Sequence, residues 1–192
     1  ILGSIDRSTV QGSRDFAILM LASSLGIRAS DICEMTLEAI NFVKNELSFI
    51  QKKTSVPLTL PLLPDVKEAL LGYLGYRKID STDEPIFIQC RAPYHKLTRM
   101  GIWTIMRRYV KQSGVDPGHR KRGTHALRSS LASSMIREQV PYYAVQKILG
   151  HESPQSTKNY VRIDIGRLRE FTLPVPEAYG RFDAFLKGGE TR

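Results

Sequence analysis

The sequence has few cysteines and no long apolar run. Cys33 and Cys90 lie far apart and form no CxxC pair. A disulfide framework or a zinc site is therefore not expected, and a reducing cytoplasm fits best. We expect both thiols to be small core residues. No apolar stretch approaches the ~20 residues that a bilayer span needs, and the first residues do not resemble a signal peptide. An initiator methionine is also lacking, so we expect a fragment of a longer protein.

What the sequence does have is an excess of positive charge. Its 192 residues include 28 lysines and arginines against 19 acidic residues, a formal net charge of +9. Such an excess favours polyanionic partners, nucleic acid before anionic membrane. The length fits one domain, with or without a tail.

Hydrophobic patterns and capping residues predict a mainly α-helical domain with a small antiparallel β-sheet. Two strand-like runs, 40–50 and 56–62, are joined by a turn at 51–55, and the prolines of the second run are typical of an edge strand. The predicted helices cover 13–24, 30–35, 65–76, 98–112, 124–139, 141–149, a short segment from 153 through Tyr160, and 163–171.

The C-terminal half carries the strongest chemical signal. His125 and Arg128 lie three residues apart at the start of a predicted helix, so they share a face. An anion such as phosphate would stabilise cations at that helix end. H-x-x-R alone matches many sequences by chance, so two surface residues without a role are the alternative. Further along, Leu149-Gly150-His151 ends a predicted helix, and Tyr160 follows nine residues later.

Together these pieces resemble the catalytic domain of the tyrosine recombinase family, from about residue 10 to residue 165. Six positions carry the family's residue types in the family's order: Arg28, Lys53, His125, Arg128, His151 and Tyr160. The stretch 25–31 is similar to the family's Gly-hydrophobic-Arg-x-Ser-acid box. Lys53 stands eight residues before the Pro61-Leu62 pair, as the family's lysine does. The chain departs from the pattern at Ser129, where histidine is common, and in its lysine turn, which lacks glycine. Lys52 leaves open which lysine acts.

The resemblance implies attack by a tyrosine phenol on a DNA phosphodiester. The sequence shows no carboxylate cluster suited to two magnesium ions, so we expect no metal and no other cofactor. Arg28 and Arg128 can each donate paired hydrogen bonds to the non-bridging oxygens, and His151 can add a third donor. Tyr160 would be the nucleophile, and His125 the acceptor of its proton. The product is a 3′-phosphotyrosine, which another 5′-hydroxyl can resolve without ATP.

Further positions have supporting roles. Lys53 is the candidate proton donor to the leaving 5′-hydroxyl, because lysine side chains generally carry a proton at neutral pH. Asp31 has two interpretations, orienting an active-site cation or capping a helix. Tyr142 and Tyr143 compete as nucleophiles, but their apolar pattern favours core packing. The residues predicted to contact the DNA backbone are Lys52, Lys96, Arg99, Arg120, Lys121 and Arg122.

The resemblance also implies an organisation and partners. Residues 1–172 would form the catalytic domain and 173–192 a C-terminal tail exchanged between protomers, while the DNA-clamping domain that precedes it in most members is absent from this chain. The implied partners are double-stranded DNA and further copies of the chain, which would form a tetramer on DNA. The isolated domain would be a monomer. The implied location is the nucleoid in the cytoplasm. The Lys53 and Tyr160 stretches look most like recombinases of mobile elements. A DNA-binding relative without catalysis and a type IB topoisomerase are the alternatives.

Overall fold

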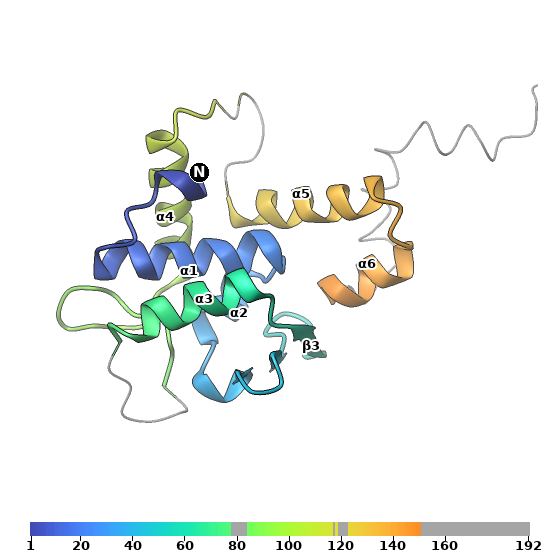
Figure 1. The fold of residues 1–192 in the computed structure, drawn as a ribbon, viewed down its shortest axis with the longest axis horizontal. Coiled ribbons are helices and arrows are strands. Elements are labelled where there is room, and N and C mark those ends of the chain that lie inside the picture. Colours follow the sequence, from blue (N-terminus) through green and yellow to red (C-terminus); the bar gives the residue numbers. More distant parts are fainter. Residues whose placement is uncertain (78–83, 117, 119–122, 151–192) are drawn as a thin grey trace, which may run out of the picture.

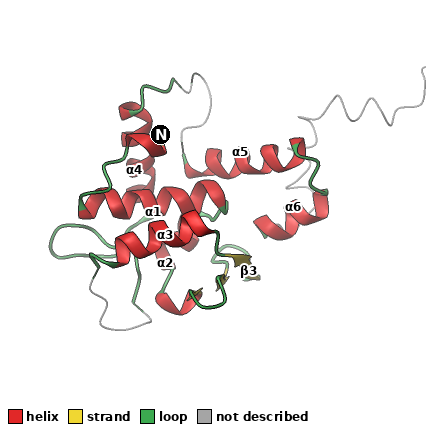
Figure 2. Ribbon diagram, viewed as in Figure 1, coloured by secondary structure: helices red, strands yellow, loops and turns green. Residues whose placement is uncertain are grey.

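The computed structural model describes residues 1–77, 84–116, 118 and 123–150. In this part the chain is mainly helical with one three-stranded antiparallel sheet, which confirms the predicted fold class (Figures 1 and 2). The elements are η1 (Leu2–Ser4), α1 (Val10–Ser24), α2 (Ala29–Glu34), η2 (Leu37–Ala39), β1 (Ile40–Asn41), β2 (Glu46–Ile50), β3 (Pro57–Pro61), α3 (Pro64–Leu74), α4 (Arg99–Gln112), α5 (Thr124–Arg137) and α6 (Tyr142–Leu149). The helices predicted beyond residue 150, and the tail, lie outside the described residues.

Helix α1 is the centre of the fold. Its N-terminus is capped by Thr9, whose hydroxyl accepts from the Gly12 amide at 3.0 Å. The stretch 17–22 is buried on every side, as expected of a helix enclosed by others. Helices α3, α4 and α5 all pack against it, and α5 lies beside the C-terminal end of α1 (Figure 1).

The sheet has the order β1-β2-β3, so β3 is an edge strand as its prolines predict. Leu47 pairs with Leu60 on the buried face. The single strand predicted over 40–50 is wrong, because a turn divides it into β1 and β2. The Asn41 side chain causes this division, since its Oδ1 accepts from the Val43 and Lys44 amides at 3.1 and 2.8 Å.

Helices α5 and α6 enclose a second, smaller core of Ala132, Ile136, Val145 and Leu149. Tyr142 packs against this core, whereas Tyr143 is 67% exposed, so core packing is wrong for Tyr143. The reason is that only one face of α6 is buried, and neighbouring residues on a helix point in different directions.

A buried ionic cluster joins α1 to α4. The Asp15 carboxylate is fully buried and accepts from Arg14 Nε at 2.9 Å, from Arg108 Nη1 at 3.2 Å and from the Tyr109 hydroxyl at 3.2 Å. Burial raises the pKa of the Asp15 carboxyl, and the two guanidiniums oppose that rise. The cluster fixes the two helices through charge-assisted hydrogen bonds.

Among the helices that the structure describes, none is both long enough and apolar enough to cross a bilayer. The same residues contain no group of three or more His, Cys, Asp or Glu side chains placed to hold a metal ion.

Candidate active site

Two arginines far apart in the sequence meet at the C-terminal end of α6. Arg28 is the N-cap residue of α2, and its Nη2 donates to the Gly150 carbonyl at 3.3 Å. Arg128 lies in α5, and its Nη2 donates to the Leu149 carbonyl. The end of a helix leaves such carbonyls without intrahelical partners and carries the negative end of the dipole, so it suits two cations.

The two guanidiniums differ in their surroundings. Arg128 is only 3% exposed, and its Nη1 also donates to the Gly26 carbonyl at 2.6 Å. Arg28 is half-buried, and among the described residues its buried Nη1 has no hydrogen-bond partner. Because a buried N–H without an acceptor is unfavourable, Arg28 has a donor ready for an oxygen that comes from outside this part of the chain.

His125 lies in the first turn of α5, one turn before Arg128, and its side chain is exposed. His151 follows Gly150 directly but, like Tyr160, lies outside the described residues. So do three of the residues predicted to contact DNA, Arg120, Lys121 and Arg122.

The turn between β2 and β3 distinguishes the two neighbouring lysines. The Lys52 ammonium pairs with Glu34 Oε1, and Lys96 donates to Glu34 Oε2 at 2.7 Å. These two bonds hold the pKa of the Glu34 carboxyl below its ordinary value. Lys53 is exposed, and no hydrogen bond or ion pair joins its ammonium to another described residue. Of the two lysines, Lys53 is thus the one whose ammonium is not engaged within the described part.

A hollow of about 520 Å³ lies between this turn, α2 and the start of α4. Four cations line it: Lys52, Lys53, Lys96 and Arg99. Glu34 and Cys33 line it too, and burial raises the pKa of the Cys33 thiol to about 11. The thiol therefore stays neutral at physiological pH, and the hollow keeps an excess of positive charge.

Asp31 does not cap α2, because Arg28 is the N-cap residue and Asp31 lies inside the helix. The capping interpretation is therefore wrong. Its buried carboxylate accepts instead from the Lys52 amide at 2.9 Å, so it holds the main chain of the turn that carries Lys53.

Gln51 is a site residue that the sequence does not signal. It begins the lysine turn, is 1% exposed, and donates from Nε2 to the Leu149 carbonyl at 3.3 Å. Polar residues in a hairpin turn are usually exposed, and only the contact with a segment 98 residues later reveals its place.

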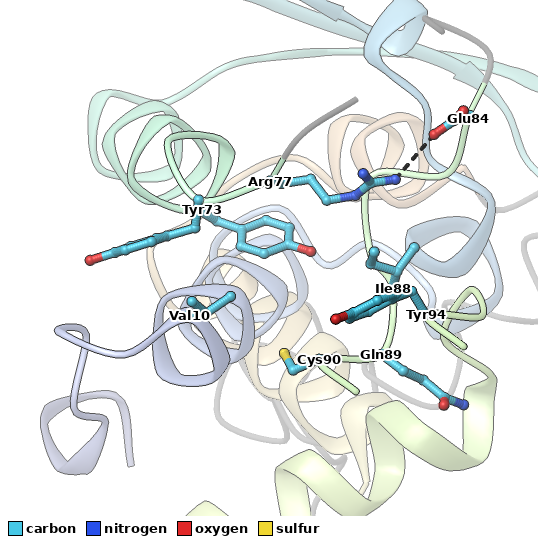
Figure 3. Close-up of a pocket in the computed structure, with 9 residues that line it drawn as sticks. Val10, Tyr73, Arg77, Glu84, Ile88, Gln89, Cys90 and Tyr94 are labelled. Atoms are coloured by element: carbon cyan, nitrogen blue, oxygen red, sulfur yellow. Dashed lines mark hydrogen bonds and ion pairs between the residues drawn. The ribbon is translucent and has the colours of Figure 1, made fainter. Parts of the chain in front are cut away.

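A second hollow, of about 530 Å³, lies at the other end of α1 (Figure 3). Val10, Tyr73 and Cys90 line it, and Arg77 reaches toward Glu84 with a 3.2 Å bond. The 15 residues of α1 separate this hollow from the two arginines by about 22 Å. We therefore do not include it in the candidate active site.

Comparisons with known proteins agree on one family. The sequence model described as the phage integrase family matches residues 2–167. The Sinorhizobium fredii protein y4gC, named an integrase/recombinase, is 34% identical over 168 residues, which cover 88% of this chain and 86% of that protein. Tyrosine recombinase XerA of Pyrococcus furiosus is 31% identical over 162 residues, or 82% of this chain and 53% of XerA. The chain thus spans about half the length of XerA.

Solved structures show the same fold. A crystal structure of the XerH site-specific recombinase, bound to its palindromic difH substrate in a post-cleavage complex, matches with a TM-score of 0.72 at 20% identity. That match covers 88% of this chain and 48% of the XerH chain. A lambda integrase dimer bound to a core site matches with a TM-score of 0.59 at 25% identity, over 86% of this chain and 56% of that one.

Proposed function

Because the chain belongs to the phage integrase family of tyrosine recombinases, we propose that it is the catalytic part of a site-specific DNA recombinase. It would cut and rejoin DNA through a covalent bond between Tyr160 and a 3′-phosphate. The DNA-bound XerH and lambda integrase structures support DNA as the substrate class.

One observation carries the proposal: three separate elements converge on the end of α6. Arg28 at the start of α2 donates to the Gly150 carbonyl, and Arg128 from α5 donates to the Leu149 carbonyl. The lysine turn reaches the Leu149 carbonyl as well, through Gln51. The next residue in the chain is His151. Both arginines and the turn that carries Lys53 are thereby brought to one end of α6, with main-chain carbonyls among the acceptors that hold them there.

The chemistry follows from the charges. Attack of the Tyr160 oxygen on phosphorus forms a P–O bond, and the bond to the 5′ oxygen breaks. Arg28 and Arg128, with His151, would stabilise the charge on the non-bridging oxygens. His125 would accept the phenol proton, and Lys53 would protonate the leaving 5′ oxygen. Asp31 would set the direction of Lys53 by holding the Lys52 amide.

The positively charged hollow beside the lysine turn would bind phosphates of the DNA backbone. Lys52, Lys96 and Arg99 line it, and phosphate contacts of this kind position a duplex without reading its sequence. The same role is proposed for the basic segment 120–122, just before α5.

Trapping the covalent intermediate tests the proposal. The chain is incubated with element-end DNA nicked one or two bases beyond the scissile phosphate, so that the short fragment diffuses away after cleavage. A protein–DNA adduct that resists denaturation is expected, and mass spectrometry should place the nucleotide on Tyr160. Tyr160→Phe should give no adduct, whereas Tyr143→Phe, which changes an exposed tyrosine of α6, should keep it. An adduct that survives Tyr160→Phe would overturn the assignment.

The trapping assay separates one alternative, and a comparison of supercoil relaxation with paired-site recombination separates the other. A DNA-binding relative without catalysis would bind DNA with the salt dependence of a basic surface but form no adduct. A type IB topoisomerase would relax supercoiled DNA without recombining paired sites.

We propose a recombinase of a mobile element in the cytoplasm, which assembles as a tetramer on two sites through its C-terminal tail. Mass measurement of the complex on paired sites tests this assembly.

A further inference from the structure

Gln51 combines deep burial with a hydrogen bond at each end of its amide, in a turn whose other residues are mostly exposed. The preceding Ile50 is 71% exposed, and both following lysines are exposed, yet Gln51 is 1% exposed. Its Nε2 donates to the Leu149 carbonyl at 3.3 Å, and its Oε1 accepts from the Thr54 hydroxyl at 2.8 Å. Both ends of the amide are therefore satisfied, as a buried polar group requires.

The amide is also in close contact with the main chain at Gly150. A Cβ atom built on Gly150 would lie 2.4 Å from both the Nε2 and the Oε1 of Gln51. The side chain thus fills the space between the lysine turn and the end of α6. Its Thr54 bond closes the turn around Lys53, and its Leu149 bond reaches the carbonyl that also accepts from Arg128.

The turn is consequently held on two sides. Asp31 in α2 holds the Lys52 amide, while Gln51 ties the turn to α6. An apolar side chain of similar length would fill the same space but could make neither hydrogen bond. The two hydrogen bonds therefore indicate that Gln51 fixes the orientation of the lysine turn in addition to filling space.

We propose that Gln51 is a positioning residue that sets the place of the Lys53 ammonium relative to the arginines at the end of α6. This inference rests on the proposed function, in which Lys53 delivers a proton to the leaving 5′ oxygen. Gln51 does not touch the DNA itself. Its effect is exerted through the geometry of the turn, so that losing it impairs proton delivery while the arginines still hold the phosphate.

A substrate with sulfur in place of the bridging 5′ oxygen isolates this step. When the Tyr160 oxygen attacks phosphorus in that substrate, the P–S bond breaks and a thiolate leaves, which needs no proton. Gln51→Met keeps the approximate shape and removes both hydrogen bonds. Thr54→Val removes only the donor to Oε1. Thr59→Val, on the exposed face of β3, is the matched control.

Single-turnover cleavage is measured on both substrates, together with Lys53→Ala. Proton transfer by a positioned side chain contributes about 10²- to 10⁴-fold to a rate, so Gln51→Met should slow cleavage of ordinary DNA by about 10- to 100-fold. On the sulfur substrate it should cleave within about threefold of the unchanged chain, as Lys53→Ala should. Thr54→Val should show a smaller effect of the same kind, and Thr59→Val none.

Other outcomes overturn the inference. Equal slowing of both substrates by Gln51→Met, with an unchanged melting temperature, would mean that Gln51 supports the arginines rather than Lys53. Cleavage of ordinary DNA at the unchanged rate would mean that it has no role in the reaction. If Gln51→Met does not fold, Thr54→Val gives the same comparison. Absence of any adduct from the unchanged chain on either substrate would instead refute the proposed function.

Discussion

Arg28, Arg128 and Gln51 meet the carbonyls of Leu149 and Gly150 at the end of α6, and we call this set of contacts the junction. Replacing Gly150 by alanine should weaken the junction. Gly150 has φ of +59°, and an added Cβ would lie 2.4 Å from the buried amide of Gln51. Gly114 offers a matched control, because it has φ of +67° but an added Cβ there meets nothing within 4 Å. Comparing the two alanine variants separates the effect of the left-handed backbone from that of the contact with Gln51.

The expected magnitudes follow from these two terms. A left-handed backbone costs a residue with a Cβ about 1–2 kcal/mol, which both variants should lose from the free energy of unfolding. Displacing the Gln51 amide leaves a buried polar group without partners, which costs about 1–3 kcal/mol more. Gly150→Ala should therefore destabilise the chain by about 2–5 kcal/mol, and Gly114→Ala by about 1–2 kcal/mol.

Urea unfolding followed by circular dichroism measures both free energies, and the trapping assay measures cleavage. We expect Gly150→Ala to slow cleavage as well, since Arg28 donates to the carbonyl of this residue. Gly114→Ala should cleave at the unchanged rate. Equal destabilisation of the two variants, with equal cleavage, would show that the contact between Gly150 and Gln51 does not hold the junction together.

Two further substitutions test the charges. Glu34→Gln frees the ammonium groups of Lys52 and Lys96, so the chain should bind DNA more tightly. The slope of log K against log[salt] should become steeper by about 0.9 for each new phosphate contact. Fluorescence anisotropy across a salt series measures this slope, and an unchanged slope would argue against a DNA-binding surface here. Asp15→Asn leaves the buried Arg14 without its carboxylate, so the free energy of unfolding should fall by about 3–5 kcal/mol in a urea titration. A loss below 1 kcal/mol would contradict the buried-pair argument.

Local features of the fold could be predicted from the sequence because neighbouring residues determine them. Thr98 caps α4 by accepting from the Gly101 amide, and Gly150 ends α6 in a left-handed conformation. Both boundaries follow from residue type alone. The turn after β1 was missed, since Asn41 bonds to its own neighbours where the apolar pattern favoured one continuous strand.

The candidate site could be predicted only in part. The order of charged and aromatic residues indicates Arg28 and Arg128, because their types repeat a family pattern. The acceptors at the end of α6 are main-chain carbonyls, which every residue possesses and no residue type marks. Gln51 and the function of Asp31 depend on contacts with distant segments, so neither could be predicted from local sequence.

The use of main-chain oxygens at this junction has a consequence for genetics. The acceptors at Gly26, Leu149 and Gly150 belong to the backbone, so no codon change can delete them. A substitution such as Gly150→Ala can displace one of these carbonyls, but only substitutions of the donors remove a hydrogen-bonding group outright. Chemical synthesis that weakens one chosen carbonyl, by exchanging the following amide for an ester, is the approach that reaches it.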